Sequence, residues 1–331
     1  MKRWLPEKPD SVWTEQVFSG AAKNADAISV NFLIEPLREL LYRGGKRWRP
    51  LLMTLVCKVL GGADAAVPLS PVIEFSHNAS LIHDDIEDGS DERRGKPAVH
   101  KLFGIDTAIN SGSFFYFLAT CCMETYVHNS LKRKEQIYQH WAECMRRLHL
   151  GQAMDIYWHR NTSAVPETED YYLMCRLKTG SLARLAAWLG ADAANAPQEA
   201  ANVLGEAAEI MGVGFQILDD VKNLTTGNPG KKRGDDIIEG KKSLPVLLYM
   251  HKYPEKRELI FDCFRTARND GTGVEELIDL LTGSGVITQA EEKGRSLLKE
   301  TRDIFNLHDF AGFPVREGGN ALLNGFLELI S

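Results

Sequence analysis

The sequence predicts an all-α protein with roughly a dozen helices in one domain. Three observations support this prediction. Apolar residues recur at helical spacing along most of the chain, strand-like alternation is nearly absent, and glycine-rich connectors separate the periodic stretches. The chain has 331 residues, of which 44% are hydrophobic, and it contains no Pro/Ser-rich or low-complexity linker. We therefore expect residues 1–331 to form a single helical bundle around one large core.

The expected helices follow one another along the chain, each with an apolar stripe or a boundary signal. The helix at 31–41 has apolar residues at i, i+4 and i+7. Ser70 is the expected N-cap, and Pro71 the first residue, of a helix that continues through the acidic residues that follow. The stretch 108–126 is apolar on almost every side, which predicts a buried helix. The remaining helices are expected at 50–60, 136–158, 168–189, 199–223, 244–250, 273–281, 288–305 and 319–329.

Charge, hydropathy and cysteine usage exclude several classes of protein. The formal net charge is −6, which argues against nucleic acid as the main partner. The longest apolar run, 114–122, is too short to span a bilayer, and no signal-peptide run follows the basic N-terminus. The six cysteines form no CxxC pair and have no metal-like spacing with histidine, which is typical of a reducing compartment. We therefore expect a cytoplasmic protein without a membrane span.

Two acidic stretches, LIHDDIED and QILDDVKN, repeat the pattern Asp-Asp-x-x-Asp/Asn in apolar helical surroundings. Residues four apart lie on one helix face, so Asp84 and Asp88 repel each other unless a hard cation binds between them. Asp219 and Asn223 repeat this geometry, and Asn223 could coordinate through its carbonyl oxygen. One motif alone would be typical of an acidic helix end entering a loop. Two motifs on different helices predict a site with several Mg²⁺ ions that holds a diphosphate from two sides.

Basic side chains near both acidic stretches could balance the charge of bound phosphate. Lys46 and Arg49 are three residues apart and could clamp one anion together. Arginine can hold phosphate through two hydrogen bonds, whereas lysine acts as a point charge. Each cluster alone would be typical of a solvated surface, but several clusters around two acidic helices are not. The other basic groups are Arg93, Arg94, Lys178, Lys231, Lys232, Lys241 and Lys242.

Three further polar residues lie at helical spacing from these groups. His77 is two turns before Asp84 on the same face, where it is either a satisfied core histidine or a donor to a second diphosphate. Gln152 and Asp155 are three residues apart and could face one cavity. Asp155 could hold a metal-bound water, a lysine or a structural hydrogen bond.

The chain resembles the trans-isoprenyl diphosphate synthases of the polyprenyl synthetase family. The resemblance rests on six motifs in the family's order between residues 44 and 245: GGKRWRP, HNASLIHDDIEDGSDERRG, GQAMD, KTG, GFQILDDVKN and GKKRGDDIIEGKKSLP. It implies an all-α isoprenoid synthase fold around a deep central cavity, usually in a homodimer. The implied reaction joins isopentenyl diphosphate to an allylic diphosphate, which is dimethylallyl, geranyl or farnesyl diphosphate.

The same resemblance implies a role for each matching residue. Asp84 and Asp88 would bind two Mg²⁺ ions and Asp219 a third, with Asp155 as a further candidate ligand. The allylic diphosphate would be held by Arg93, Lys178, Thr179, Gln216, Lys231 and Lys241. Isopentenyl diphosphate would be held by Lys46, Arg49, His77 and Arg94, and Gln152 is a further candidate for substrate binding. The groups expected to act in catalysis are Asp84, Asp88, Asp219, Lys178 and Arg93.

Product length depends on the depth of the cavity behind the first acidic motif. The short first motif and the asparagine that ends the second make the chain most similar to geranylgeranyl diphosphate synthases of the eukaryotic type. Ala79 and Ser80 lie about one turn before Asp84 and are too small to close a tunnel near its mouth. The aromatic run 114–117, with Phe115, is either the floor or ordinary core packing. We expect a twenty-carbon product, with a longer polyprenyl product as the alternative.

Three other classes of protein remain as alternatives. A terpene cyclase on the same fold needs the metal site but no second diphosphate pocket. Condensation is favoured by the presence of Lys46, Arg49, His77 and Arg94. A non-catalytic subunit of a heteromeric synthase would have lost part of an acidic motif. A plain helical scaffold would require all six motifs to be coincidental. Residues 1–25 and those beyond residue 255 carry no motif that indicates a function.

Overall fold

The computed structural model describes residues 1–331 except 23, 127–130, 162, 228–232 and 331. Its α-helices in the first half of the chain are α1 Ser11–Phe18, α2 Ala27–Tyr42, α3 Trp48–Val59, α4 Ser70–Glu87, α5 Val99–Phe103, α6 Ile105–Thr125 and α7 Leu131–Arg160. Those that follow are α8 Thr168–Cys175, α9 Ser181–Ala193, α10 Gln198–Thr225, α11 Asp235–Glu239, α12 Leu244–Lys252, α13 Arg257–Asp270, α14 Gly273–Ser284, α15 Val286–Phe305 and α16 Gly319–Ile330. The predicted all-α class is confirmed.

The described strands are four pieces of two residues each. They form two antiparallel pairs, β1 Glu92–Arg93 with β2 Lys96–Pro97, and β3 Asp309–Phe310 with β4 Phe313–Pro314. The first pair follows α4 directly and carries Arg93 and Arg94 on a tight turn. Arg94 has φ +55° and Gly95 has φ +72°, the left-handed backbone that such a turn requires. This hairpin therefore returns two arginines to the acidic end of α4.

Helices occupy every stretch in which they were predicted, with differences at particular boundaries. The N-cap of α4 is Leu69, so the prediction of Ser70 was wrong by one position, because a 3₁₀ turn at Val67–Leu69 leads directly into the helix. The stretch predicted as one helix at 168–189 contains a π-helical turn at Arg176–Gly180 between α8 and α9. Between the second acidic motif and Lys241, where no helix was predicted, the structure contains the short helix α11.

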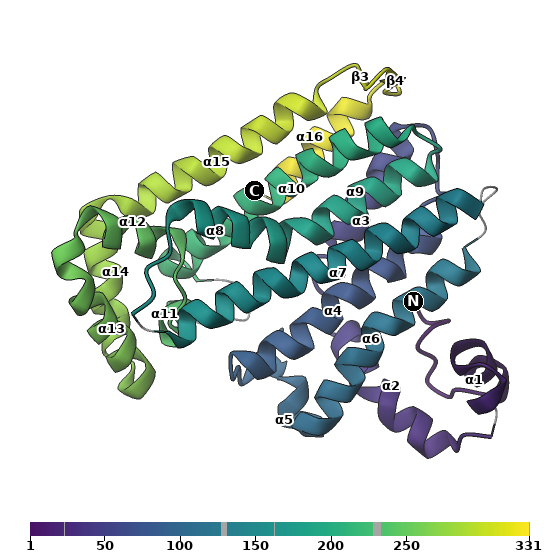
Figure 1. Cartoon of the computed structure of the whole chain (residues 1–331), viewed down its shortest axis with the longest axis horizontal. Helices are drawn as coiled ribbons and strands as arrows, with labels where there is room; N and C mark the ends of the chain where they lie inside the picture. The colour runs from purple at the N-terminus through teal and green to yellow at the C-terminus, as the bar shows by residue number, and fades with distance from the viewer. Residues whose placement is uncertain (23, 127–130, 162, 228–232, 331) are drawn as a thin grey trace.

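α10 lies at the centre of the helical assembly and packs against α9 on one side and α15 on the other. α4 packs against α6, and α3 packs against α9 (Figure 1). The buried apolar residues form two clusters, and α10 contributes to both, with Leu204 and Met211 in one and Ile217 and Leu224 in the other. Since one continuous helix joins the two clusters, we propose that the whole chain is one domain. Among the described helices, none is both long and apolar enough to cross a membrane.

Candidate active site

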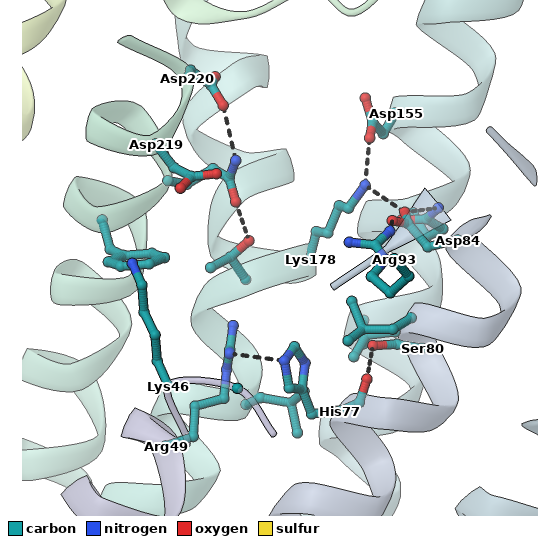
Figure 2. Close-up of a pocket in the computed structure, with 18 of the residues that line it drawn as sticks. Lys46, Arg49, His77, Ser80, Asp84, Arg93, Asp155, Lys178, Asp219 and Asp220 are labelled. Carbon is teal, nitrogen blue, oxygen red and sulfur yellow. Dashed lines mark hydrogen bonds and ion pairs between the residues drawn. The ribbon is translucent and has the colours of Figure 1, made fainter. Parts of the chain in front are cut away.

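A cavity of about 940 Å³ lies between α4, α7, α10 and the π-helical turn. Figure 2 shows Asp219 and Asp220 on one wall and Asp84, Asp155, Lys178 and Arg93 on the opposite wall. Lys46, Arg49 and His77 lie together at one end of the same view. The two acidic helices thus face each other across the cavity, as the sequence predicted.

Asp84 lies at the centre of a network of cationic and amide donors. Its carboxylate accepts hydrogen bonds from Gln152 Nε2 at 3.0 Å, Lys178 Nζ at 3.3 Å and Arg93 Nη2 at 3.3 Å. Arg93 also donates from Nε to Asp85 Oδ1 at 2.8 Å. Asp85 is fully buried and does not face the cavity. Its charge is compensated by the ion pair with Arg93. The Asp84 carboxylate is thereby held toward the cavity by groups from three other segments.

Lys178 joins the first acidic motif to α7. Its Nζ donates to Asp155 Oδ2 at 2.5 Å as well as to Asp84. Burial alone would lower the pKa of Lys178, but Asp155 and then Asp84 raise it above the usual range. Burial alone would likewise raise the pKa of Asp155, but Lys178 and Lys241 hold it below its usual range. Of the roles predicted for Asp155, the structure therefore shows the pairing with a lysine.

Asp88, the C-cap residue of α4, is joined to the segment around α11. Lys241 Nζ lies 3.1 Å from Asp88 Oδ2 and 3.7 Å from Asp236 Oδ1, and it is also paired with Glu239. Burial alone would lower the pKa of Lys241, but Asp88 and Glu239 raise it well above the usual range. Lys241 therefore links the segment that follows the second acidic motif to the end of the first.

The second acidic motif differs from the first in its surroundings. Asp219 lines the cavity, whereas the adjacent Asp220 accepts hydrogen bonds from Tyr171 OH at 2.7 Å and Gln216 Nε2 at 2.9 Å. Burial, followed by the neighbouring carboxylate of Asp236, raises the pKa of Asp220 to about 7. Thr179 Oγ1 in turn donates to Gln216 Oε1 at 2.8 Å. Asp220 therefore fixes the side chains of Tyr171 and Gln216 in the cavity wall beside Asp219.

Asn223 does not take the coordinating position suggested by its spacing. Its side chain is fully buried, and its Oδ1 accepts a hydrogen bond from the backbone N–H of Asp236 at 3.4 Å. The amide thus ties α10 to the start of α11. The physical reason is that the last residue of this motif faces α11 and not the cavity.

The basic end of the cavity combines α3 with the middle of α4. Arg49 lies 4.2 Å above the ring of Trp48, and its Nη1 is 3.4 Å from His77 Nε2. Burial lowers the pKa of Arg49 to about 10. Burial, then Arg49 and Arg94, lowers the pKa of His77 well below its usual range, so this histidine is neutral at pH 7. Lys46 Nζ lies 5.5 Å from the Phe215 ring centroid. These groups form a basic cluster separate from the acidic motifs.

The carboxylates of the two motifs have the chemistry of Mg²⁺ ligands. In the part of the chain that the structure describes, no three acidic, histidine or cysteine side chains converge to hold a metal ion unaided. Mg²⁺ usually binds one or two carboxylates and completes its shell with water and substrate phosphate, so a three-residue cluster is not required. Asp84 and Asp219 face the cavity, and Asp88 Oδ1 is buried without a hydrogen-bond partner among the described residues. The residues present therefore fit this ion.

Most of the predicted site residues line the cavity. They are Lys46, Arg49, His77, Ser80, Asp84, Arg93, Arg94, Gln152, Asp155, Lys178, Thr179, Gln216, Asp219 and Lys241. Asp88 is paired with Lys241 and does not line the described cavity. Ala79 and Phe115 are fully buried and do not line it either. Phe115 packs on Phe75, with ring centroids 4.7 Å apart. Lys231 and Lys232 lie outside the described residues.

Sequence analysis missed several residues of the cavity wall. Glu74 is 2% exposed, lies three residues before His77, and its Oε2 is 4.0 Å from Arg47 Nε. Asp236 and Tyr171 also line the cavity, and both hold parts of the second motif. The helical spacing of Glu74, His77 and Asp84 could have placed Glu74 on the cavity face. No comparable signal exists for Tyr171, because its contact with Asp220 joins distant segments.

The position of Lys178 depends on a close approach between α7 and the π-helical turn. A Cβ at Gly151 would lie 2.4 Å from the backbone N of Lys178, so Gly151→Ala must displace the turn. We expect this variant to lose about 1–3 kcal/mol of stability through overpacking, and to lose activity because Lys178 moves. Urea denaturation and kcat check both expectations. Gly283→Ala is the matched control, since nothing lies within 4 Å of a Cβ there. Equal stability of the two variants would contradict the close-packing argument.

The fold and the site together define a prenyltransferase with the all-helical isoprenoid synthase fold. The polyprenyl synthetase family model matches residues 30–281, so the chain belongs to this family. The family and fold predicted from the six motifs are thus confirmed.

Individual relatives and solved structures show which members of the family the chain is similar to. The chain is 33% identical over 300 residues to geranylfarnesyl diphosphate synthase of Aeropyrum pernix, a match that covers 88% of this chain and 92% of the relative. It is 36% identical over 262 residues to geranylgeranyl pyrophosphate synthase 2 of Zymoseptoria tritici, covering 78% and 76%. The crystal structure of geranylgeranyl pyrophosphate synthetase from Pyrococcus horikoshii superposes with a TM-score of 0.80 at 27% identity, covering 96% and 94%.

Proposed function

We propose that this chain condenses isopentenyl diphosphate with an allylic diphosphate in the presence of Mg²⁺ and that its main product is geranylgeranyl diphosphate. One observation carries the proposal. The cavity holds two facing carboxylate helices and, apart from them, a basic group formed by Lys46, Arg49 and His77. A site with one diphosphate pocket would serve a cyclase, whereas two pockets serve a condensation. Geranylgeranyl pyrophosphate synthases among the relatives support the choice of product.

The residues of the cavity have distinct tasks in this reaction. Bound Mg²⁺, of which we propose three ions, would neutralise the allylic diphosphate as its bond to C1 breaks. Asp84, Asp88 and Asp219 would hold the ions, and Lys178, Arg93 and Lys241 would contact the phosphate oxygens. Lys46, Arg49 and Arg94 would hold isopentenyl diphosphate, with neutral His77 donating a hydrogen bond. The C1–O bond breaks, a bond forms between C1 and C4 of isopentenyl diphosphate, and a C2 proton leaves to the released diphosphate.

Charge complementarity explains how the cavity is preorganised. Asp84, Asp88 and Asp155 are paired with Lys178 and Lys241. When a metal–diphosphate complex binds, the lysines can turn to phosphate while the carboxylates turn to Mg²⁺. The same side chains thus exchange one set of opposite charges for another, which limits reorganisation during the reaction.

The exposed face of α6 supports a homodimer. Phe117 is 65% exposed, and Ile105 and Ile109 of the same helix are also exposed. Large apolar side chains on one helix are typical of an interface. We therefore propose that two copies pair through α6, and that sedimentation velocity gives the mass of two chains. A single-chain mass at micromolar concentration would contradict this.

All six cysteines are buried and unpaired, which supports a reducing, cytoplasmic location.

Three parallel incubations test the proposed function. Dimethylallyl, geranyl and farnesyl diphosphate are each supplied with labelled isopentenyl diphosphate and Mg²⁺, and the products are sized after dephosphorylation. We expect a twenty-carbon product that depends on Mg²⁺ and disappears with a chelator. A cyclic hydrocarbon from the allylic substrate alone would favour the cyclase. Activity only after addition of a second subunit would favour a heteromeric enzyme.

A further inference from the structure

We propose that Glu74 and Asn78, one turn apart on α4, are positioning residues for isopentenyl diphosphate. They hold Arg47 and Arg94 in place and thereby fix the loop 44–47, which carries Lys46. The inference rests on the proposed function, because it concerns the pocket for the second diphosphate. Neither residue needs to touch the substrate, since both act through cationic side chains and the backbone of the loop.

Glu74 is a buried carboxylate in basic surroundings. It is 2% exposed and lines the cavity close to His77, and its Oε2 lies 4.0 Å from Arg47 Nε. Burial raises the pKa of its carboxyl, whereas Arg47, Arg49 and Arg94 act in the opposite direction. A buried carboxylate is tolerated only beside such compensating cations. Glu74 therefore offsets part of the positive charge of the basic cluster before a diphosphate binds.

Asn78 connects Glu74 to Arg94. The Asn78 side chain is fully buried, and its Nδ2 donates to the backbone O of Glu74 at 2.7 Å and to Glu74 Oε2 at 3.4 Å. Its Oδ1 accepts a hydrogen bond from Arg94 Nη1 at 3.2 Å. An amide has one donor end and one acceptor end, so the two bonds to Glu74 turn the acceptor toward Arg94. Removing the Glu74 carboxylate removes one of the two bonds that set this orientation.

Arg94 in turn lies against the loop 44–47. Its Nη1 also donates to the backbone O of Leu40 near the end of α2 at 3.2 Å. A Cβ at Gly45 would lie 3.0 Å from Arg94 Nη2 and 3.1 Å from its Cζ, so the guanidinium rests on the loop backbone where a glycine stands. Arg94 therefore supports the loop at the residue that precedes Lys46.

Arg47 supports the loop on the other side of Lys46. It is the N-cap of α3 and has φ +47°, a left-handed conformation that is unfavourable for a residue with a Cβ. Its Nη2 donates to the backbone O of Leu41 at 3.2 Å, and its Nε faces Glu74. Such a conformation persists only where surrounding contacts hold it. Lys46 is thus fixed between two supports, and both of them lead to Glu74.

Removing the charge of Glu74 has two opposing effects on diphosphate binding. One negative charge fewer would by itself strengthen the attraction of the pocket for an anion. However, the Arg47 side chain is 44% exposed and can turn to water once it loses Glu74. Arginine binds phosphate strongly only when its donors are correctly placed. We therefore expect the loss of geometry to outweigh the gain in charge.

Steady-state kinetics of Glu74→Gln test the proposal. The KM for isopentenyl diphosphate should rise about tenfold, whereas the KM for the allylic diphosphate should stay the same. Combining Glu74→Gln with Arg47→Leu should raise the KM by less than the product of the two single effects, since Glu74 acts through Arg47. Glu209→Gln is the matched control, because Glu209 is a buried carboxylate paired with arginines outside the basic cluster. An unchanged or lower KM for isopentenyl diphosphate in folded Glu74→Gln would overturn the proposal.

Limited proteolysis examines the loop directly and needs no substrate. Trypsin cleaves after Lys46 and Arg47, and mass spectrometry identifies the fragments. Cleavage at these two positions should be faster in Glu74→Gln than in the unmodified protein or in Glu209→Gln, because the loop opens more often. Other tryptic sites should be cleaved at unchanged rates, which separates a loosened loop from general unfolding. Equal rates after Lys46 and Arg47 would also overturn the inference, whereas a loosened loop in a protein that forms no prenyl product would contradict only the proposed function.

Discussion

Asp84→Asn is expected to lower kcat by about 100-fold or more while leaving the fold intact. The substitution keeps the shape of the side chain but removes the charge that would hold Mg²⁺ opposite Asp219. Lys178 keeps Asp155 as a partner at 2.5 Å, and Arg93 keeps Asp85 at 2.8 Å, so no buried cation is left unpaired. The loss should therefore appear in turnover and not in stability. Steady-state kinetics and urea denaturation of the same preparation measure turnover and stability separately.

The dependence on Mg²⁺ distinguishes a lost metal ligand from a lost hydrogen bond. In Asp84→Asn we expect half-maximal activity to require a higher Mg²⁺ concentration than in the unmodified enzyme. Asp91→Asn is the control, because the Asp91 side chain is 83% exposed and pairs with Lys101 at the surface. That variant should keep its kcat and its Mg²⁺ dependence. An Asp84→Asn enzyme with normal kcat and normal Mg²⁺ dependence would exclude the metal assignment.

Helices with a broad apolar stripe were predicted from sequence, whereas α13 was missed although its spacing is helical. Its buried residues are Ile260, Cys263, Phe264 and Ala267, a narrow i, i+3, i+4, i+7 stripe in an otherwise charged segment. α11 has five residues and is held by tertiary contacts, among them the hydrogen bond from the backbone of Asp236 to Asn223. Short helices of this kind have little intrinsic stability, so local sequence carries little signal for them.

The site could be predicted where spacing along one helix decides which groups share a face. Asp84 and His77 are examples, since α4 presents both to the cavity. Contacts between distant segments could not be predicted in this way. The pairing of Lys241 with Asp88 and the hydrogen bond from Tyr171 to Asp220 join residues far apart in the chain. The asymmetry of the two motifs was predicted from composition, but the structure gives it a cause, because Asn223 faces α11.

Lys178→Met is expected to lower both activity and stability, for two separable reasons. Turnover should fall by about 100-fold or more, because the cation that would contact the leaving diphosphate is removed. The free energy of unfolding should fall by about 3–5 kcal/mol at pH 7, because Asp155 is left as a buried carboxylate without its lysine. The Asp155 side chain is only 8% exposed, so solvent cannot replace the lost partner. Kinetics and urea denaturation measure the two effects independently.

The pH dependence of the free energy of unfolding identifies why Lys178→Met is less stable. In the unmodified protein Lys178 holds the pKa of Asp155 below its usual range, so this pair stabilises the fold above the ordinary carboxyl pKa and the contribution is lost as pH falls. In Lys178→Met burial dominates and raises the pKa of Asp155. The contribution of this carboxyl to stability is then lost as pH rises and not as pH falls. That variant should therefore gain stability relative to the unmodified protein as pH falls from 7 to 5. Adding Asp155→Asn should restore stability at pH 7 but not turnover, since the amide needs no counter-ion while the diphosphate still lacks its lysine. A double variant as unstable as Lys178→Met would show that the lysine stabilises the fold through contacts other than Asp155.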